Sequence, residues 1–128
     1  ALMGFDAAVR WNTQQGRDLN KVALLVEGPL DAAKLGAPAI STLGSFISED
    51  QASTLQKVFH HVAYIPDKDM AGDKATENFF KRFQGTGTRA EVKPIPGDSE
   101  DAGAMTEQLA SIFRDSIVNQ STGMRLGM

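Results

Sequence analysis

The chain has 128 residues, of which 41% are hydrophobic and 23% are charged. This length and composition fit one compact domain and leave no room for a second domain of ordinary size. The chain has no cysteine, which excludes disulfide bonds, a cysteine nucleophile and a zinc ribbon, and its two adjacent histidines cannot complete a zinc site. Any metal ion must therefore be bound through oxygen. The net charge of −3 argues against a domain that binds nucleic acid by charge alone.

The apolar runs of the sequence are short. The run Val22–Val26, among the longest, is far shorter than the roughly 20 residues that cross a bilayer. The N-terminus also lacks the pattern of a signal peptide. We therefore expect a cytoplasmic protein without membrane contact.

The first 20 residues have a mixed composition. A short helix is expected around Phe5–Trp11, and the polar stretch Gln14–Asp18 is typical of a loop, so residues 1–20 are interpreted as a linker or the end of a preceding domain. The following run, Val22–Val26, has no polar alternation, which predicts a strand buried on both faces. Such strands belong to parallel sheets.

Alternating strands and helices follow along the chain. The further strands are expected at Ala39–Leu43, Val62–Ile65 and Arg89–Ile95. The helices are expected from Pro29 to about Leu35, from Ser48 to about Phe59, over Met70–Phe83, and from about Thr106 to Phe113. Ser48 and Gln51 have the spacing of a capping box. Residues 115–128 are polar and are expected to form a flexible tail.

This alternation predicts an α/β fold with a Rossmann-like, doubly wound and mainly parallel sheet of about four strands with flanking helices over residues 21–114. In such a sheet the ligand site lies beyond the carboxyl ends of the strands. Seven of the 16 acidic residues are expected at this edge: Glu27, Asp31, Asp67, Asp69, Asp98, Glu100 and Asp101. Like charges gathered at one place require either wide spacing in solvent or a cation.

The acidic residues differ in how strongly each one indicates a metal site. Asp31 lies in the first turn of a helix, where the helix N-terminus by itself favours an acid. Glu27 extends a buried strand at a position where Val or Ile would be expected. Asp67 and Asp69 lie on a tight turn, where both carboxylates can reach one cation, as an octahedral Mg²⁺ site with retained waters requires.

Other metal-binding and nucleotide-binding motifs do not match the residue spacing of this sequence. A calcium-binding EF-hand loop starting at Asp67 would have Ala71 at its fifth position and Asn78 at its twelfth. The glycine patterns of a P-loop and of a dinucleotide fold are absent after the first strand. His60 and His61 precede a strand, opposite the expected site, and are interpreted as structural. Tyr64 lies in the middle of a strand and is interpreted as a core residue rather than a nucleophile.

Four segments together resemble the Toprim superfamily. Val26–Ala32 resembles its first signature, a strand ending in Glu-Gly with an Asp three residues after the Gly, and Ile65–Gly72 resembles its second, Asp-x-Asp followed by Ala-Gly. Between them, Ser41–Ser45 is similar to the family's strand-to-glycine segment, and Asp101–Gly103 to the loop after its fourth strand. The resemblance extends from about Lys21 to Leu109 with the segments in order.

Within the superfamily, the chain looks most like the primases of bacteria and bacteriophages, including primase-helicases. The resemblance implies RNA primer synthesis from ribonucleotides on single-stranded DNA, with Mg²⁺, or Mn²⁺ in its place. It implies that Glu27 is the metal-proximal acid or general base, that Asp67 and Asp69 are metal ligands, and that Asp101 adds to the metal site. Four residues would support turns or let the backbone approach the nucleotide: Gly28, Asp31, Gly44 and Gly72.

A complete primase also carries a zinc-binding domain and a basic subdomain, so these and a helicase are expected as fused or associated partners. Two other functions stay open. One is a metal-dependent nuclease or a topoisomerase-like strand-cleaving protein, since the same carboxylates serve hydrolysis and a tyrosine nucleophile could come from outside the domain. The other is a non-catalytic Toprim interaction module.

Overall fold

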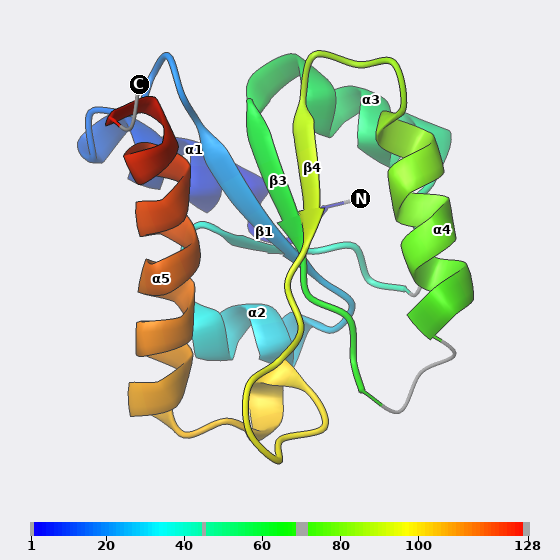
Figure 1. Ribbon diagram of the computed structural model, residues 1–128, viewed down its shortest axis with the longest axis vertical. Helices are drawn as coiled ribbons and strands as arrows, with labels where there is room; N and C mark the ends of the chain where they lie inside the picture. The colour runs from blue at the N-terminus through cyan, green and yellow to red at the C-terminus, as the bar shows by residue number, and fades with distance from the viewer. Residues whose placement is uncertain (1, 45, 69–71, 127–128) are drawn as a thin grey trace.

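The computed structural model describes residues 2–44, 46–68 and 72–126, and its centre is a four-stranded sheet (Figure 1). The strands are β1 (Val22–Val26), β2 (Ala39–Ser41), β3 (His61–Tyr64) and β4 (Arg89–Val92). They are ordered β2-β1-β3-β4, and every neighbouring pair is parallel. The helices are α1 (Phe5–Gln14), α2 (Pro29–Leu35), α3 (Glu49–Val58), α4 (Gly72–Phe83), the 3₁₀ turn η1 (Ala102–Ala104) and α5 (Glu107–Leu126). The predicted fold class is confirmed.

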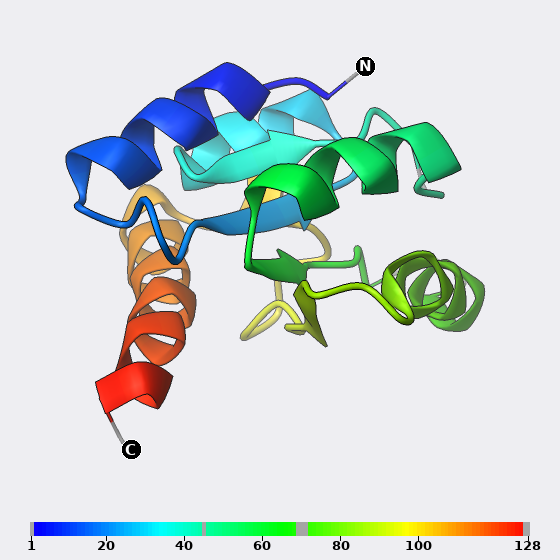
Figure 2. The same cartoon turned by 90° about the horizontal axis from the view of Figure 1, so that it is seen from above.

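Two hydrophobic cores lie on the two faces of the sheet. Leu55 of α3 and Phe79 of α4 belong to the core on one face. Leu35 of α2 and Ile117 of α5 belong to the core on the other. Figure 2 shows α3 and α4 on one side of the sheet, α5 on the other, and α1 along the β2 edge. Because helices cover both faces, β1 is buried throughout, as its unbroken apolar run predicts.

The N-terminal residues are part of the fold, so their interpretation as a linker is wrong for α1. Ala8 and Asn12 of this helix are buried. The Asn12 side chain donates to the carbonyl of Val22 over 2.9 Å and accepts from its N–H over 2.9 Å. Met3 pairs with Ser41 in an isolated antiparallel bridge. The amphipathic pattern of α1 was hidden because one of its buried positions is a polar residue.

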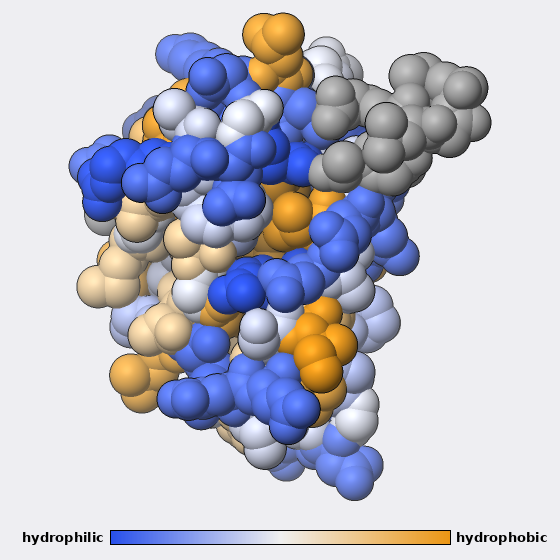
Figure 3. All heavy atoms as spheres, turned by 90° about the vertical axis from the view of Figure 1, so that its left-hand side faces the viewer, coloured by the Kyte–Doolittle hydropathy of each residue, from blue (hydrophilic) through white to orange (hydrophobic). Residues whose placement is uncertain are grey.

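The predicted flexible tail after Asp115 is also wrong. Helix α5 does not end near Phe113 but continues to Leu126, and Ile117 and Val118 are buried. Ser121 is buried too and accepts a hydrogen bond of 3.1 Å from the Arg17 guanidinium. One stripe of buried residues spaced three or four apart therefore extends the helix through a stretch of polar composition. Figure 3 shows mostly hydrophilic residues on this side of the molecule, with hydrophobic residues in small patches.

The remaining elements differ from prediction mainly at their ends. Strand β2 ends at Ser41 and β4 at Val92, earlier than expected, because both then turn into loops. The capping box is confirmed: the Ser48 hydroxyl accepts from the Gln51 N–H over 3.1 Å, and the Gln51 side chain accepts from the Ser48 N–H. Among the residues that the structure describes, no helix combines the length and the apolar character needed to cross a membrane.

Candidate functional site

The direction in which the strands are added reverses between β1 and β3. The chain passes from β1 to β2 on one side and then crosses to β3 on the other. Ligands of doubly wound sheets bind in the crevice at such a switch point, beyond the carboxyl ends of the strands. Glu27 directly follows β1, and Asp67 follows β3 after two residues; both are half-buried. Two of the predicted catalytic carboxylates thus flank the switch point.

The carboxylate of Glu27 is positioned by a tyrosine. The Tyr64 hydroxyl donates a hydrogen bond of 3.1 Å to Glu27 Oε1, and the Tyr64 ring packs at 5.3 Å from that of Phe79. Burial raises the pKa of the Tyr64 phenol, and the negative charges of Glu27 and Asp67 raise it further. Tyr64 therefore stays a neutral donor at physiological pH. It keeps one oxygen of Glu27 in a fixed place.

Sequence reasoning missed this positioning contact. Tyr64 is a core residue, as predicted, since its side chain is in the core beneath α3 and α4. Its hydroxyl nevertheless reaches a residue 37 positions away in the sequence. The only available signal was an aromatic residue with a polar tip within a predicted buried strand, and it pointed to no particular partner.

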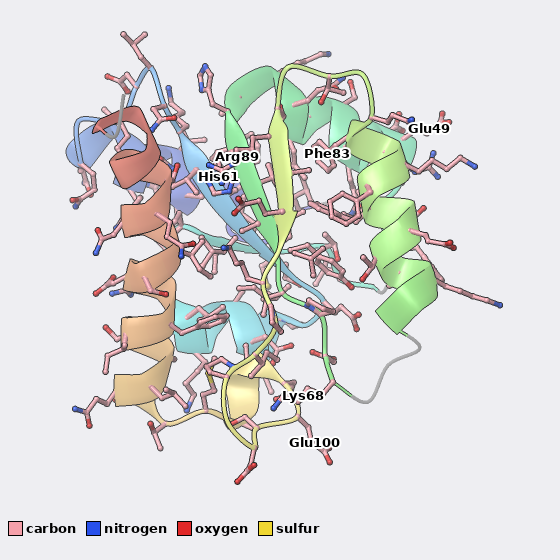
Figure 4. The ribbon with its side chains drawn as sticks, in the orientation of Figure 1. Glu49, His61, Lys68, Phe83, Arg89 and Glu100 are labelled. Carbon is pink, nitrogen blue, oxygen red and sulfur yellow. The ribbon has the colours of Figure 1, made fainter. Side chains whose placement is uncertain are left out.

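The loops after β3 and β4 are bound to each other through Lys68. Its backbone N–H donates to the carbonyl of Glu100 over 2.7 Å, and its ammonium group donates to the carbonyl of Gly97. Figure 4 shows Lys68 and Glu100 side by side at the carboxyl end of the sheet. Asp98 and Glu100 are themselves exposed to solvent. Solvent therefore screens the repulsion between these two carboxylates, so they require no cation.

Asp31 joins the turn after β1 to the loop after β4. It is buried, and its Oδ1 accepts from the N–H of Gly103 over 2.7 Å. Burial raises the pKa of Asp31, the hydrogen bond from Gly103 opposes this, and the nearby Asp101 carboxylate raises the pKa again. A Cβ atom on Gly103 would lie 2.8 Å from Asp31 Oδ1, and one on Gly28 would lie 3.1 Å from Oδ2. Both glycines therefore permit the close approach of this carboxylate.

The Asp101 carboxylate accepts from the Ala104 N–H over 2.9 Å and so caps η1. Its negative charge acts on the nearby Asp31 carboxylate. Over residues 2–44, 46–68 and 72–126, no group of three or more His, Cys, Asp or Glu side chains is arranged to hold a metal ion. Asp69 lies outside the described residues. The predicted four-carboxylate metal site thus stays a prediction, with Glu27, Asp67 and Asp101 as its described members.

The two remaining glycines occupy the same edge of the sheet. Gly44 follows β2, and a Cβ atom added there would meet nothing within 4 Å. Gly72 is the first residue of α4. Open space therefore lies next to the backbone at Gly44, which leaves room for a ligand to approach.

Residues 24–118, well over half of the chain, match the family described as Toprim-like. The chain belongs to this Toprim-like family. No curated protein sequence compared with the domain matches it.

Solved structures with a similar fold include two primases. The domain is similar to the Aquifex aeolicus primase (zinc binding and RNA polymerase domains) at 24% identity and a TM-score of 0.65, covering 95% of the domain and 29% of that chain. It is also similar to a DNA primase domain from Pseudomonas aeruginosa at 28% identity and a TM-score of 0.64, covering 81% of the domain and 33% of that chain. The Toprim-like domain thus spans about a third of the length of these proteins.

A buried histidine lies at the opposite end of the sheet. Figure 4 shows His61 and Arg89 beside each other, far along the strands from Lys68. His61 Nε2 lies 3.0 Å from Glu91 Oε2, while its buried Nδ1 has no hydrogen-bond partner among the described residues. Burial lowers the pKa of His61, and Glu91 opposes this shift. Burial by itself would raise the pKa of Glu91, but His61, Arg89 and Lys93 together lower it.

The lowered pKa values predict that the domain loses stability on acidification. Because folded His61 has a pKa below its ordinary value of about 6.5, the unfolded chain binds more protons as the pH falls through about 6.5, and the unfolding free energy decreases. Glu91 acts in the same direction at lower pH, and Asp31, whose pKa is raised, acts in the opposite direction. We expect His61→Gln to reduce the pH dependence of urea unfolding between pH 7.5 and 5.5.

The matched control is His60→Gln, since His60 is exposed. Asp31 and Glu91 are present in both variants, so the difference between them isolates His61. If His61→Gln follows the same pH dependence as His60→Gln, the buried imidazole does not titrate as described.

Proposed function

We propose that this Toprim-like domain is the metal-binding catalytic domain of a DNA primase, which joins ribonucleotides into RNA primers on single-stranded DNA. The observation that carries the proposal is the placement of Glu27 and Asp67 on either side of the switch point, with Tyr64 orienting Glu27. The similarity to a Pseudomonas aeruginosa DNA primase domain at 28% identity supports the choice of primase within the family.

The donor set of this edge fits Mg²⁺. Carboxylate oxygens are the ligands that Mg²⁺ prefers, and this ion commonly keeps several waters, so two or three protein ligands suffice. Glu27, Asp67 and Asp69 would hold the ion, with Asp101 as an additional member, and Mn²⁺ would substitute for Mg²⁺. When bound, the cation neutralises charge on the phosphate oxygens.

The residues of the chain itself serve mainly to position the reactants. Phosphoryl transfer depends on positioning and on neutralising oxygen charge more than on covalent chemistry by the protein. Tyr64 keeps Glu27 in place, and Glu27 acts as the metal-proximal acid or as the base that receives the proton of the attacking hydroxyl. Lys68 joins the loop that carries Asp67 to the loop that precedes Asp101.

The position of Tyr64 argues against topoisomerase chemistry by this chain alone. Its side chain is 2% exposed, and its hydroxyl is hydrogen-bonded to Glu27. A nucleophile that attacks DNA must be accessible and activated by an adjacent base rather than buried with a raised pKa. It is the only tyrosine in the sequence.

The first test is metal binding by the 128-residue chain. We expect weak binding of Mn²⁺, because few protein ligands and several waters complete the shell. Paramagnetic broadening of amide NMR signals should centre on Glu27, Asp67 and Asp69. Broadening centred on His60 and His61 instead would contradict the metal-site assignment.

A second prediction concerns the 128-residue chain as an enzyme. We expect it not to synthesise primers alone, because binding of template and nucleotides needs basic surface and the chain has a net charge of −3. A zinc-binding or basic primase subdomain, and an associated helicase, would provide that surface. Primer synthesis should be compared between this chain and the full-length gene product. Robust synthesis by the chain alone would show that the template-binding surface has been assigned wrongly.

A further inference from the structure

The described residues of the loop between β2 and α3, 42–44 and 46–48, are held by hydrogen bonds at the two ends of the loop, beside the candidate site. At one end the Thr42 N–H donates to the carbonyl of Val26 over 3.0 Å. At the other end the carbonyl of Ile47 accepts from the side chains of Asn78, over 3.2 Å, and Arg82, over 3.0 Å. The ends of the loop are therefore held by β1, the strand that leads to Glu27, and by α4.

This loop exposes two large hydrophobic side chains. Leu43 is 51% exposed and Phe46 is 57% exposed. Leu43 also has a φ of 62°, which bulky residues seldom adopt. The open backbone at Gly44 lies between them. Hydrophobic side chains that face solvent next to residues held by hydrogen bonds have the features of a binding surface.

The exposed side chains border a cavity of about 740 Å³, here called the Phe46 pocket. Its lining combines Phe5, Leu43 and Phe46 with the polar residues Thr42 and Thr54. Among its described lining residues none is Lys or Arg, whereas two are acids, Asp6 and Asp50. A phosphate group would be repelled there. This combination of aromatic and polar lining residues fits a flat, uncharged group with an aromatic face and a hydrogen-bonding edge.

Proximity to the carboxylates narrows the choice of ligand. The Ser41 hydroxyl donates to the backbone carbonyl of Glu27 over 2.8 Å, and Thr42 begins the loop at the next residue. A ligand that occupies both regions must have a flat aromatic part for the Phe46 pocket and an anionic part for a cation at Glu27 and Asp67. Nucleotides have this construction, and proteins commonly bind exposed bases by stacking them on aromatic side chains.

We propose that the Phe46 pocket binds a nucleobase stacked on the Phe46 ring, with the attached phosphates directed toward Glu27 and Asp67. The direction of the phosphates rests on the proposed function, because it requires a cation at these carboxylates. The base itself binds through the loop and needs no metal. A free ribonucleotide and an unpaired base of a nucleic-acid strand share this chemistry.

The test is an NMR titration of the 128-residue chain with three ligands. These are adenosine in chelator, ATP with Mg²⁺, and a short single-stranded oligodeoxynucleotide. We expect shifts of the Leu43, Gly44 and Phe46 amides with all three. Phe46→Ala should weaken binding by roughly tenfold, which is the scale of one base stacked on an aromatic ring. Phe46→Trp should restore binding.

Phe80→Ala is the matched control, because Phe80 is an exposed phenylalanine of α4 outside this pocket and is 44% exposed. Tighter binding of the oligonucleotide than of ATP would identify a strand base as the ligand, and the reverse order a free nucleotide. The proposal is overturned if adenosine shifts the amide signals of the α4 groove that contains Lys74 and Lys81 instead of those of the Phe46 pocket. It is also overturned if adenosine shifts the amide signals of neither region, or if Phe46→Ala binds adenosine as tightly as the wild type does.

The same titrations separate this proposal from the proposed function. Adenosine shifts at Phe46 without Mn²⁺ broadening at Glu27 would support the base pocket and contradict the catalytic metal site. Mn²⁺ broadening at Glu27 without adenosine shifts would support the metal site and overturn the base pocket.

Discussion

Glu27→Gln is expected to lower metal-dependent primer synthesis by roughly 10²–10³-fold, the scale at which one preorganised electrostatic contact acts. Glutamine keeps the size of Glu27 and an oxygen that can accept from the Tyr64 hydroxyl, so the local packing should be retained. It removes the negative charge that a cation or a base requires. The measurement is the rate of primer synthesis by the full-length gene product carrying this substitution. In the 128-residue chain, Mn²⁺ broadening should weaken in parallel.

Two further variants make the Glu27 result specific. Glu107→Gln removes an exposed carboxylate at the start of α5 and should leave the rate unchanged. Tyr64→Phe keeps the buried ring but removes the hydroxyl that positions Glu27, so it should cause a smaller loss than Glu27→Gln. Thermal melts of all three variants exclude unfolding as the cause. Primer synthesis by Glu27→Gln at the wild-type rate would show that Glu27 is neither ligand nor base.

The sheet could be predicted from sequence because its signals are local. Val22–Val26 is an unbroken apolar run, Pro29 and Gly36 border the helix between them, and Ser48 with Gln51 starts the next helix. Each of these patterns depends on residues within a few positions of one another. Once the strands are known, the parallel topology places Glu27 and Asp67 at one edge without any further information.

The parts that could not be predicted depend on contacts between distant segments. The Tyr64 hydroxyl, the Lys68 ammonium group and the Asp31 carboxylate each have a partner at least 29 positions away. No spacing in the sequence indicates such pairs. The extension of α5 was missed for a related reason: its buried stripe is diluted by polar residues, and only packing against the sheet shows that Ile117 faces the core.

Among the residues of α1, Asn12 is expected to lower the free energy of unfolding most when it is substituted. Its side chain is fully buried, donates to the carbonyls of Ala8 and Val22, and accepts from the N–H of Val22. Asn12→Ala removes these partners where β1 begins, in a region that water does not reach. A buried polar group left without a partner costs about 1–3 kcal/mol, so a loss of about 2–4 kcal/mol in unfolding free energy is expected. Urea unfolding monitored by circular dichroism measures it.

The control is Asn119→Ala, the same substitution at an exposed position of α5, which should change the unfolding free energy by less than about 0.5 kcal/mol. A domain of this size has a total stability of only about 5–15 kcal/mol, so the Asn12 loss is a large share of it. The expected loss also tests whether α1 belongs to the folding unit. If Asn12→Ala behaves like Asn119→Ala, the contacts of α1 with β1 add little to stability.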